Sequence, residues 1–197
     1  MNQVKIKGSL PYWINGHNFY SSCHDWDEGL DYLSGCLGTN VYSGLVECFE
    51  YGTIQEVPFS EEQFLRNHIK LLGYQCREYK QGNIITGKEF ISPALKVKIY
   101  DVSRNIKNKL DKAIQEEISR LYGWDRAKYY IKIESHCKKP EAYFKGNVYV
   151  NELLSSSFQV QLQNDLISTY KHIMKTGKLV LPDRKADLMQ GLYQCLS

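Results

Sequence analysis

The sequence Leu95-Lys96-Val97-Lys98-Ile99-Tyr100-Asp101 alternates between aliphatic and polar residues. Side chains of a β-strand point alternately to its two faces, so this stretch predicts a strand with an apolar face and a face of lysine and tyrosine. Residues 45–52 (LVECFEYG) and 129–136 (YYIKIESH) are interpreted as neighbouring strands of the same sheet. We therefore expect a sheet with a core face and a polar face, and we expect a ligand to bind the polar face.

Further strands and helices are expected on both sides of these segments. Residues 3–14 and 74–80 have the composition of strands, and apolar residues at helical spacing predict five helices. The expected helices span residues 25–37, Ser60 to Leu72, Asp101 or Ser103 to Leu121, Asn151 or Ser155 to Lys175, and residues 183–196.

The fold class that follows is α+β. We expect an antiparallel or mixed sheet of about five strands, with helices packed on one face and a helical C-terminal third. Residues 1–150 would form an α+β domain, and the C-terminal helices of residues 151–197 would pack on the same domain.

Charge is unevenly distributed along the chain of 197 residues, which has a formal net charge of +3. Residues 1–59 carry a net charge of −5, and residues 60–139 carry +7. A basic zone beside a polar sheet face suggests a polyanionic partner. An ordinary solvated lysine surface would give the same charge, and this alternative stays open here.

The cysteines and the hydropathy indicate the compartment. The six cysteines include no C-x-x-C pair, and residues 1–11 contain no long apolar segment of a secretory signal. No stretch approaches the roughly eighteen consecutive apolar residues of a membrane span. We therefore expect a cytoplasmic protein with reduced thiols and no membrane partner.

Several short segments carry a resemblance to one protein family. Residues 5–10 (KIKGSL) precede an aromatic and Asn/Gly-rich stretch over residues 12–20, and residues 46–52 end in an acid-aromatic-Gly run. Residues 95–101 resemble a strand that ends in Tyr-Asp-Lys, and residues 132–136 (KIESH) resemble an Arg-x-Glu strand.

The order of these segments completes the resemblance. Lys138-Lys139-Pro140 follows the last strand, and an amphipathic helix then ends near a Tyr-x-x-Ile motif, here Tyr170 to Ile173. Over residues 3–175 the chain resembles the replication initiators of small phages and plasmids. That family includes the filamentous-phage replication protein and related rolling-circle initiators.

The resemblance implies an initiator-like fold and an endonuclease that nicks single-stranded DNA during replication initiation. A tyrosine would attack a phosphodiester and stay linked to the 5′ phosphate, while Mg²⁺ or Mn²⁺ polarises the scissile phosphate. Tyr100 is the implied nucleophile, ahead of Tyr129 and Tyr130. The implied metal ligands are Glu50, Glu134 and His136. The implied contacts to a single strand or an origin hairpin are Lys96, Lys98, Arg104, Lys107 and Lys132.

Two departures from the family pattern keep other functions open. No two of the five histidines are separated by a single residue, and Val102 stands where the family has a lysine. A non-catalytic phage- or plasmid-encoded protein on the same scaffold would bind nucleic acid or a host nucleoprotein without a metal, for example to inhibit host defence. An unrelated α+β domain could instead bind another protein through the sheet. In the plainest interpretation, Glu134 and Lys98 form a cross-strand ion pair and Tyr100 only packs.

Overall fold

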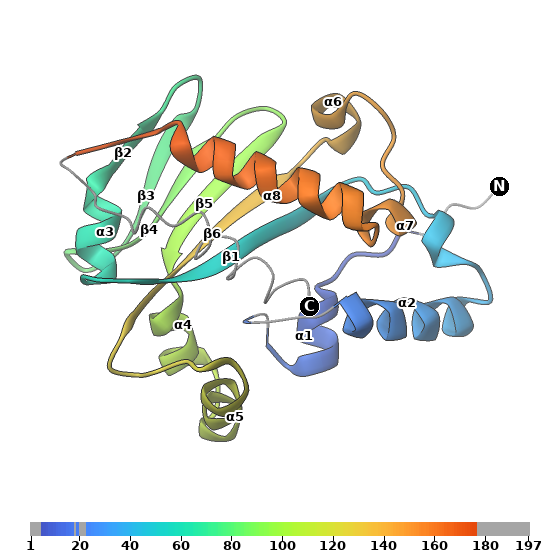
Figure 1. Cartoon of the computed structure of the whole chain (residues 1–197), viewed down its shortest axis with the longest axis horizontal. Coiled ribbons are helices and arrows are strands. Elements are labelled where there is room, and N and C mark those ends of the chain that lie inside the picture. Colours follow the sequence, from blue (N-terminus) through green and yellow to red (C-terminus); the bar gives the residue numbers. More distant parts are fainter. Residues whose placement is uncertain (1–4, 18, 20–22, 177–197) are drawn as a thin grey trace.

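Five antiparallel strands form the central sheet of the computed structural model, which describes residues 5–17, 19 and 23–176 (Figure 1). The strand order is β1 (Phe49–Val57), β6 (Tyr129–Cys137), β5 (Leu95–Asp101), β4 (Ile84–Ile91) and β3 (Gln75–Gln81). The central strand, β5, pairs with β6 so that Lys98 is the register partner of Glu134. The α+β class and the five-stranded antiparallel sheet are confirmed.

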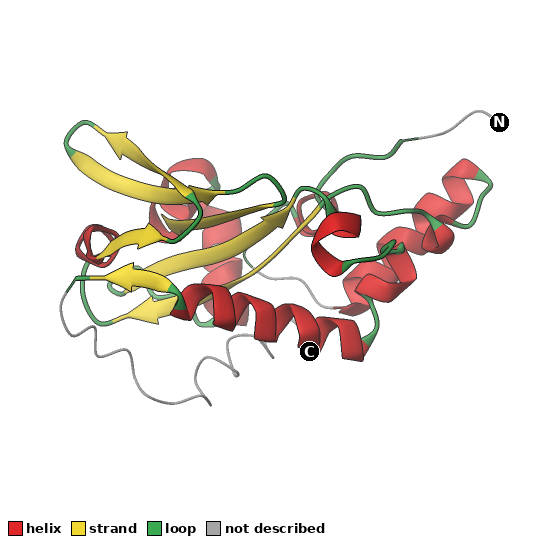
Figure 2. Cartoon of the chain, turned by 90° about the horizontal axis from the view of Figure 1, so that it is seen from above, coloured by secondary structure: helices red, strands yellow, loops and turns green. Residues whose placement is uncertain are grey.

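The apolar face of the sheet is covered by α3 (Glu61–Asn67) and α8 (Ser156–Lys171). Figures 1 and 2 show α8 running along one side of the sheet. Each helix begins after a serine whose hydroxyl accepts a hydrogen bond from the backbone N–H three residues later. Side chains of the helices and strands exclude solvent between them, including Phe64, Leu65, Val97, Ile99, Ile131 and Leu166.

A second apolar cluster covers one end of the polar face. It is built by α4 (Val102–Lys109) and α5 (Lys112–Tyr122), which lie below the end of the sheet in Figure 1. Ile106 and Ile118 of these helices are buried in a cluster that also contains Tyr100 and Tyr130 of the strands. Helices therefore lie on both faces of the sheet, whereas the sequence predicted helices on one face only. The reason is that apolar side chains at one end of the polar face are buried by α4 and α5.

The N-terminal part is helical where a strand was predicted. Residues 5–9 are irregular, and α1 (Leu10–Asn15) has Pro11 in its first turn, where a missing N–H costs nothing. It ends at Gly16, whose φ of 69° is left-handed. The helix expected over residues 25–37 is confirmed as α2 (Cys23–Leu37). The remaining short helices are η1 (Val41–Ser43), α6 (Pro140–Phe144) and α7 (Val150–Leu153).

Several predicted boundaries are wrong for identifiable reasons. β1 begins only at Phe49, and β4 was not predicted because Thr86-Gly87 resembles a turn. The long helix expected after Asp101 is interrupted because the Asp111 carboxylate caps a new helix, α5. The helices expected to reach Leu72 and Lys175 end earlier, and their last residues form the strand pair β2 (His68–Leu71) and β7 (Ile173–Lys175). The helix expected over residues 183–196 lies outside the described residues.

Candidate functional site

The polar face of the sheet brings predicted site residues from three strands into register. Between β5 and β6, Lys96 pairs with His136, Lys98 with Glu134 and Tyr100 with Lys132. Glu50 of β1 flanks His136, and Glu89 of β4 flanks Lys98. We call this set the polar patch: Glu50, Glu89, Lys96, Lys98, Tyr100, Lys132, Glu134 and His136.

Glu134 is the hub of the polar patch. Its Oε1 accepts a hydrogen bond from Nζ of Lys98 at 2.8 Å, and its Oε2 accepts one from the Tyr100 hydroxyl at 3.1 Å. Nζ of Lys132 lies 3.4 Å from the same Oε2. The Glu134 side chain is only 7% exposed, so it is a desolvated carboxylate whose charge is compensated by two lysines.

Glu50 lies at the solvent side of the same network. Its Oε1 accepts a hydrogen bond from Nζ of Lys98 at 3.0 Å and lies 3.1 Å from Nδ1 of His136. That nitrogen makes no hydrogen bond to any residue that the structure describes. The Glu50 side chain is 48% exposed, and burial lowers the pKa of His136. The contact between Glu50 and His136 therefore becomes an ion pair only when the imidazole is protonated.

Glu89 extends the patch across β4, a strand that the sequence did not predict. Nζ of Lys96 lies 3.4 Å from Oε1 of Glu89, and the Tyr79 hydroxyl also hydrogen-bonds this carboxylate. Burial opposes the charged form of Glu89, but these hydrogen bonds and the charge of Lys96 keep its pKa below the usual range. Each of the three carboxylates in the patch thus has a lysine partner.

Two glycines make room for the centre of the patch, and the sequence reasoning did not include them in the site. A Cβ atom at Gly52 of β1 would lie 2.4 Å from the carbonyl oxygen of Ile133 and 2.7 Å from Cβ of Glu134. A Cβ atom at Gly87 of β4 would lie 3.1 Å from Cβ of Tyr100. Gly52 belongs to the acid-aromatic-Gly run of residues 50–52, which was the available signal.

The electrostatics make Tyr100 a weak nucleophile. Burial raises the pKa of its hydroxyl, and the adjacent negative charge of Glu134 raises it further. Burial alone would raise the pKa of Glu134, but the charge of Lys132 and the hydrogen bonds from Lys98 and Tyr100 outweigh burial and lower it. Tyr100 is therefore neutral at neutral pH, beside a carboxylate of reduced basicity.

The predicted metal ligands Glu50, Glu134 and His136 lie on neighbouring strands, but they are arranged around an ammonium group. Nζ of Lys98 is hydrogen-bonded to both carboxylates. Among the residues that the structure describes, no three His, Cys, Asp or Glu side chains are placed to hold a metal ion. The side chains as placed do not fit a divalent cation, and Mg²⁺ or Mn²⁺ remains a prediction.

Arg104 and Lys107 lie on α4, outside the network of the polar patch. Arg104 pairs with Asp101 at 3.3 Å and donates a hydrogen bond to Gln81 at 2.7 Å. Nζ of Lys107 donates to the backbone oxygen of Arg126 at 3.3 Å. These two predicted DNA contacts follow directly after β5 in the chain, and the contacts above join them to residues outside the patch.

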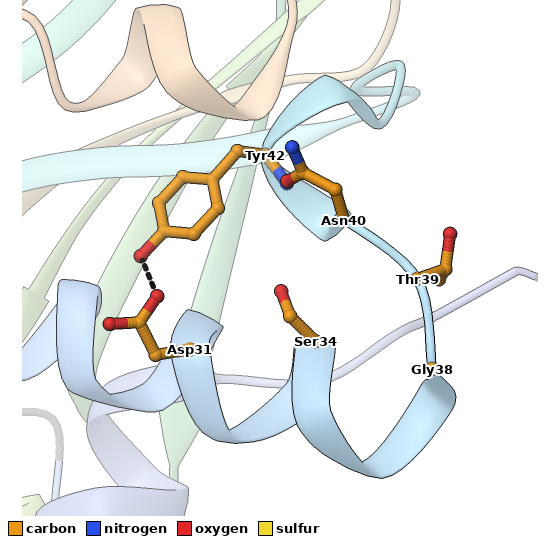
Figure 3. Close-up of a pocket in the computed structure, with 6 residues that line it drawn as sticks. All are labelled: Asp31, Ser34, Gly38, Thr39, Asn40 and Tyr42. Atoms are coloured by element: carbon orange, nitrogen blue, oxygen red, sulfur yellow. Dashed lines mark hydrogen bonds between the residues drawn. The ribbon is translucent and has the colours of Figure 1, made fainter.

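Away from the patch, a shallow hollow of about 520 Å³ lies between α2 and η1 (Figure 3). Asp31 is its one charged lining residue, and the Tyr42 hydroxyl donates a hydrogen bond to this carboxylate at 2.8 Å. Small polar residues line the rest, and the hollow is wide open to solvent. Nothing in it matches the predicted chemistry.

Comparison of the chain with protein-family models, curated proteins and solved structures finds no match. Across the described part of the chain, no helix has both the length and the apolar character needed to span a membrane. The polar patch and the sequence are therefore the two sources of evidence on function.

Proposed function

We propose that the protein binds single-stranded DNA through the polar patch, with Arg104 and Lys107 of α4 as flanking contacts. The main supporting observation is that three lysines and a histidine of two adjacent strands gather on one face, beside a half-exposed carboxylate. DNA phosphates are recognised by N–H donors of this kind.

Charge and sequence both favour this proposal. Residues 60–139, which supply every lysine and arginine of the proposed interface, have a net charge of +7. The polar patch itself balances three lysines against three glutamates, so the positive charge comes from Arg104, Lys107 and the other basic residues of this segment. A net positive segment attracts a polyanion and makes its affinity depend on salt. The resemblance to phage and plasmid replication initiators favours a single DNA strand and a cytoplasmic location.

Substitution of Lys98 or Lys96 by glutamine tests the proposal. Each variant should bind a fluorescent single-stranded oligonucleotide less tightly, with about a tenfold loss near 0.1 M salt and a salt slope smaller by about 0.7 for each lost phosphate contact. Lys70→Gln, at an exposed position on β2, is the matched control. Affinities of both patch variants equal to that of the control would reject the proposal. Thermal melts would identify a variant that has unfolded, and Lys96 is the more tolerant position because it has only one carboxylate partner in the patch.

Nicking through Tyr100 is the second candidate function. Its support is the hydrogen bond from the Tyr100 hydroxyl to Glu134, which offers a base for the phenolic proton. The phenolic oxygen would form a bond to phosphorus, the bond from phosphorus to the 3′ oxygen would break, and the leaving 3′ oxygen would take up a proton. The raised pKa of Tyr100 makes binding without cleavage the better-supported proposal.

A covalent adduct separates the two functions. The protein would be incubated with 5′- or 3′-labelled single strands in buffers with and without Mg²⁺ or Mn²⁺, then denatured and resolved on a gel. An adduct that disappears in Tyr100→Phe would establish nicking by Tyr100. An adduct that persists in Tyr100→Phe would assign the reaction to another residue, and binding without any adduct is the outcome we expect.

A further inference from the structure

We infer that the Glu50 carboxylate occupies a phosphate position of the polar patch and competes with DNA for Lys98 and His136. This inference depends on the proposed function, because it identifies where in the DNA interface a phosphate binds. An oxygen of the incoming phosphate would take the place of Oε1 of Glu50, and the Glu50 side chain would swing into solvent.

The contacts of Glu50 are those of a bound anion. One oxygen of its carboxylate lies 3.0 Å from Nζ of Lys98 and 3.1 Å from Nδ1 of His136. An ammonium group and an imidazole nitrogen that converge on one oxygen form a typical arrangement for recognition of a phosphate oxygen, with the imidazole donating when it is protonated. The side chains of Lys98 and His136 are 22% and 27% exposed, and Nδ1 of His136 is itself shielded from solvent beside the Glu50 carboxylate that the phosphate would displace.

Glu50, unlike Glu134, can leave its partners at little cost. The Glu134 side chain is 7% exposed, is contacted by three groups and would be stranded as a buried charge if its partners moved. The Glu50 side chain is 48% exposed, so water can solvate its carboxylate as soon as the contact breaks. Lys98 keeps Glu134 as a partner throughout the exchange, and its charge is never uncompensated.

The chain contains a matched acid for comparison. Glu56 lies six residues further along β1 and therefore on the same face, and its side chain is 51% exposed. It forms a 2.8 Å ion pair with Lys128, which is itself 50% exposed. Glu56 is thus equal to Glu50 in strand, face, charge and exposure, but it belongs to a surface pair outside the polar patch.

Glu50→Gln and Glu56→Gln distinguish a phosphate position from a general effect of charge. Removal of any surface acid should raise the affinity for single-stranded DNA slightly, and equally for both variants. In Glu50→Gln, and not in Glu56→Gln, the loss of the carboxylate also frees a phosphate position, which should raise the affinity for DNA further. We expect this variant to bind about fivefold to tenfold more tightly than Glu56→Gln, with a salt slope steeper by about 0.7, the increment for one further phosphate contact.

The double variant Lys98→Gln/Glu50→Gln completes the test, because the gain from Glu50→Gln should vanish when Lys98 is absent. Equal affinities of the two single glutamate variants would overturn the inference, as would weaker binding by Glu50→Gln. If either result occurred while Lys98→Gln still weakened binding, the proposed function would stand and only the role of Glu50 would fail. If no variant and no wild-type protein bound DNA, the proposed function would fail and the inference with it.

Discussion

A histidine lies on each side of the central sheet, His68 of β2 in the core and His136 of β6 on the polar face, and their surroundings are opposite in character. On the core side, His68 is excluded from solvent, and its ring nitrogens contact the carbonyl oxygen of Phe64 at 2.7 Å and the Tyr170 hydroxyl at 3.0 Å. On the polar face, His136 is 27% exposed, and its Nδ1 lies 3.1 Å from the carboxylate of Glu50, which is 48% exposed. Both nitrogens of the first histidine are satisfied, whereas the second has a partner that can be exchanged.

The carboxylates of the two faces show the same contrast. Asp165 of α8 accepts hydrogen bonds from two neutral groups, the hydroxyls of Tyr51 and Tyr143. Glu134 of the polar patch is surrounded by two ammonium groups and one hydroxyl. Hydrogen bonds from neutral hydroxyls to the Asp165 carboxylate join α8 to the sheet and stabilise the fold. A network rich in lysine adds charges that an external anion can bind, and this difference is why we assign function to the polar face.

The largest expected effect on stability sharpens this contrast. Glu134→Gln should lower the free energy of unfolding by about 3 kcal/mol, because it leaves the charges of Lys98 and Lys132 without their buried counter-charge. Asp165→Asn is the matched isosteric change on the other face, and it should cost only about 1 kcal/mol because its partners are neutral hydroxyls: one keeps the remaining amide oxygen as its acceptor, and the other can rotate to accept from the amide N–H. Chemical denaturation of both variants at pH 7 measures the difference. Equal losses would show that the two networks do not differ in the way we describe.

The sequence predicted the polar patch better than it predicted the fold around it. The alternation of residues 95–101 and 129–136 sufficed to place Lys96, Lys98, Glu134 and His136 on one face, because strand alternation is local. The strand that carries Glu50 was predicted four residues too early, yet Glu50 was still placed on the correct face. Alternate residues share a face wherever the strand begins, so a wrong boundary does not change the face of Glu50.

What the sequence missed depends on contacts between distant segments. Gly87 resembles a turn residue, yet it lies inside β4 because Tyr100 on the neighbouring strand needs the space. Because Thr86-Gly87 was interpreted as a turn, β4 and its residue Glu89 were not predicted. The cover that α4 and α5 give to one end of the polar face was also missed. It depends on Tyr100 and Tyr130 facing the helices, and no pattern within either segment shows that.

A smaller effect on stability is expected from the buried His68, and it should appear in the pH dependence of the free energy of unfolding. Burial lowers the pKa of His68 to about 4, whereas an exposed histidine in the unfolded chain titrates near 6.5. The unfolded state therefore binds the proton first, so the stability that neutral His68 contributes is complete above pH 6.5 and is lost as the pH falls toward 4. We expect a loss of about 2 kcal/mol between pH 6.5 and pH 5, measured by chemical denaturation.

His68→Gln should flatten this dependence far more than His136→Gln, since the polar-face imidazole can accept a proton beside Glu50 without leaving its place. If both substitutions flattened the pH dependence equally, His136 would resist protonation as strongly as His68. The proposed difference between the two histidines would then be wrong.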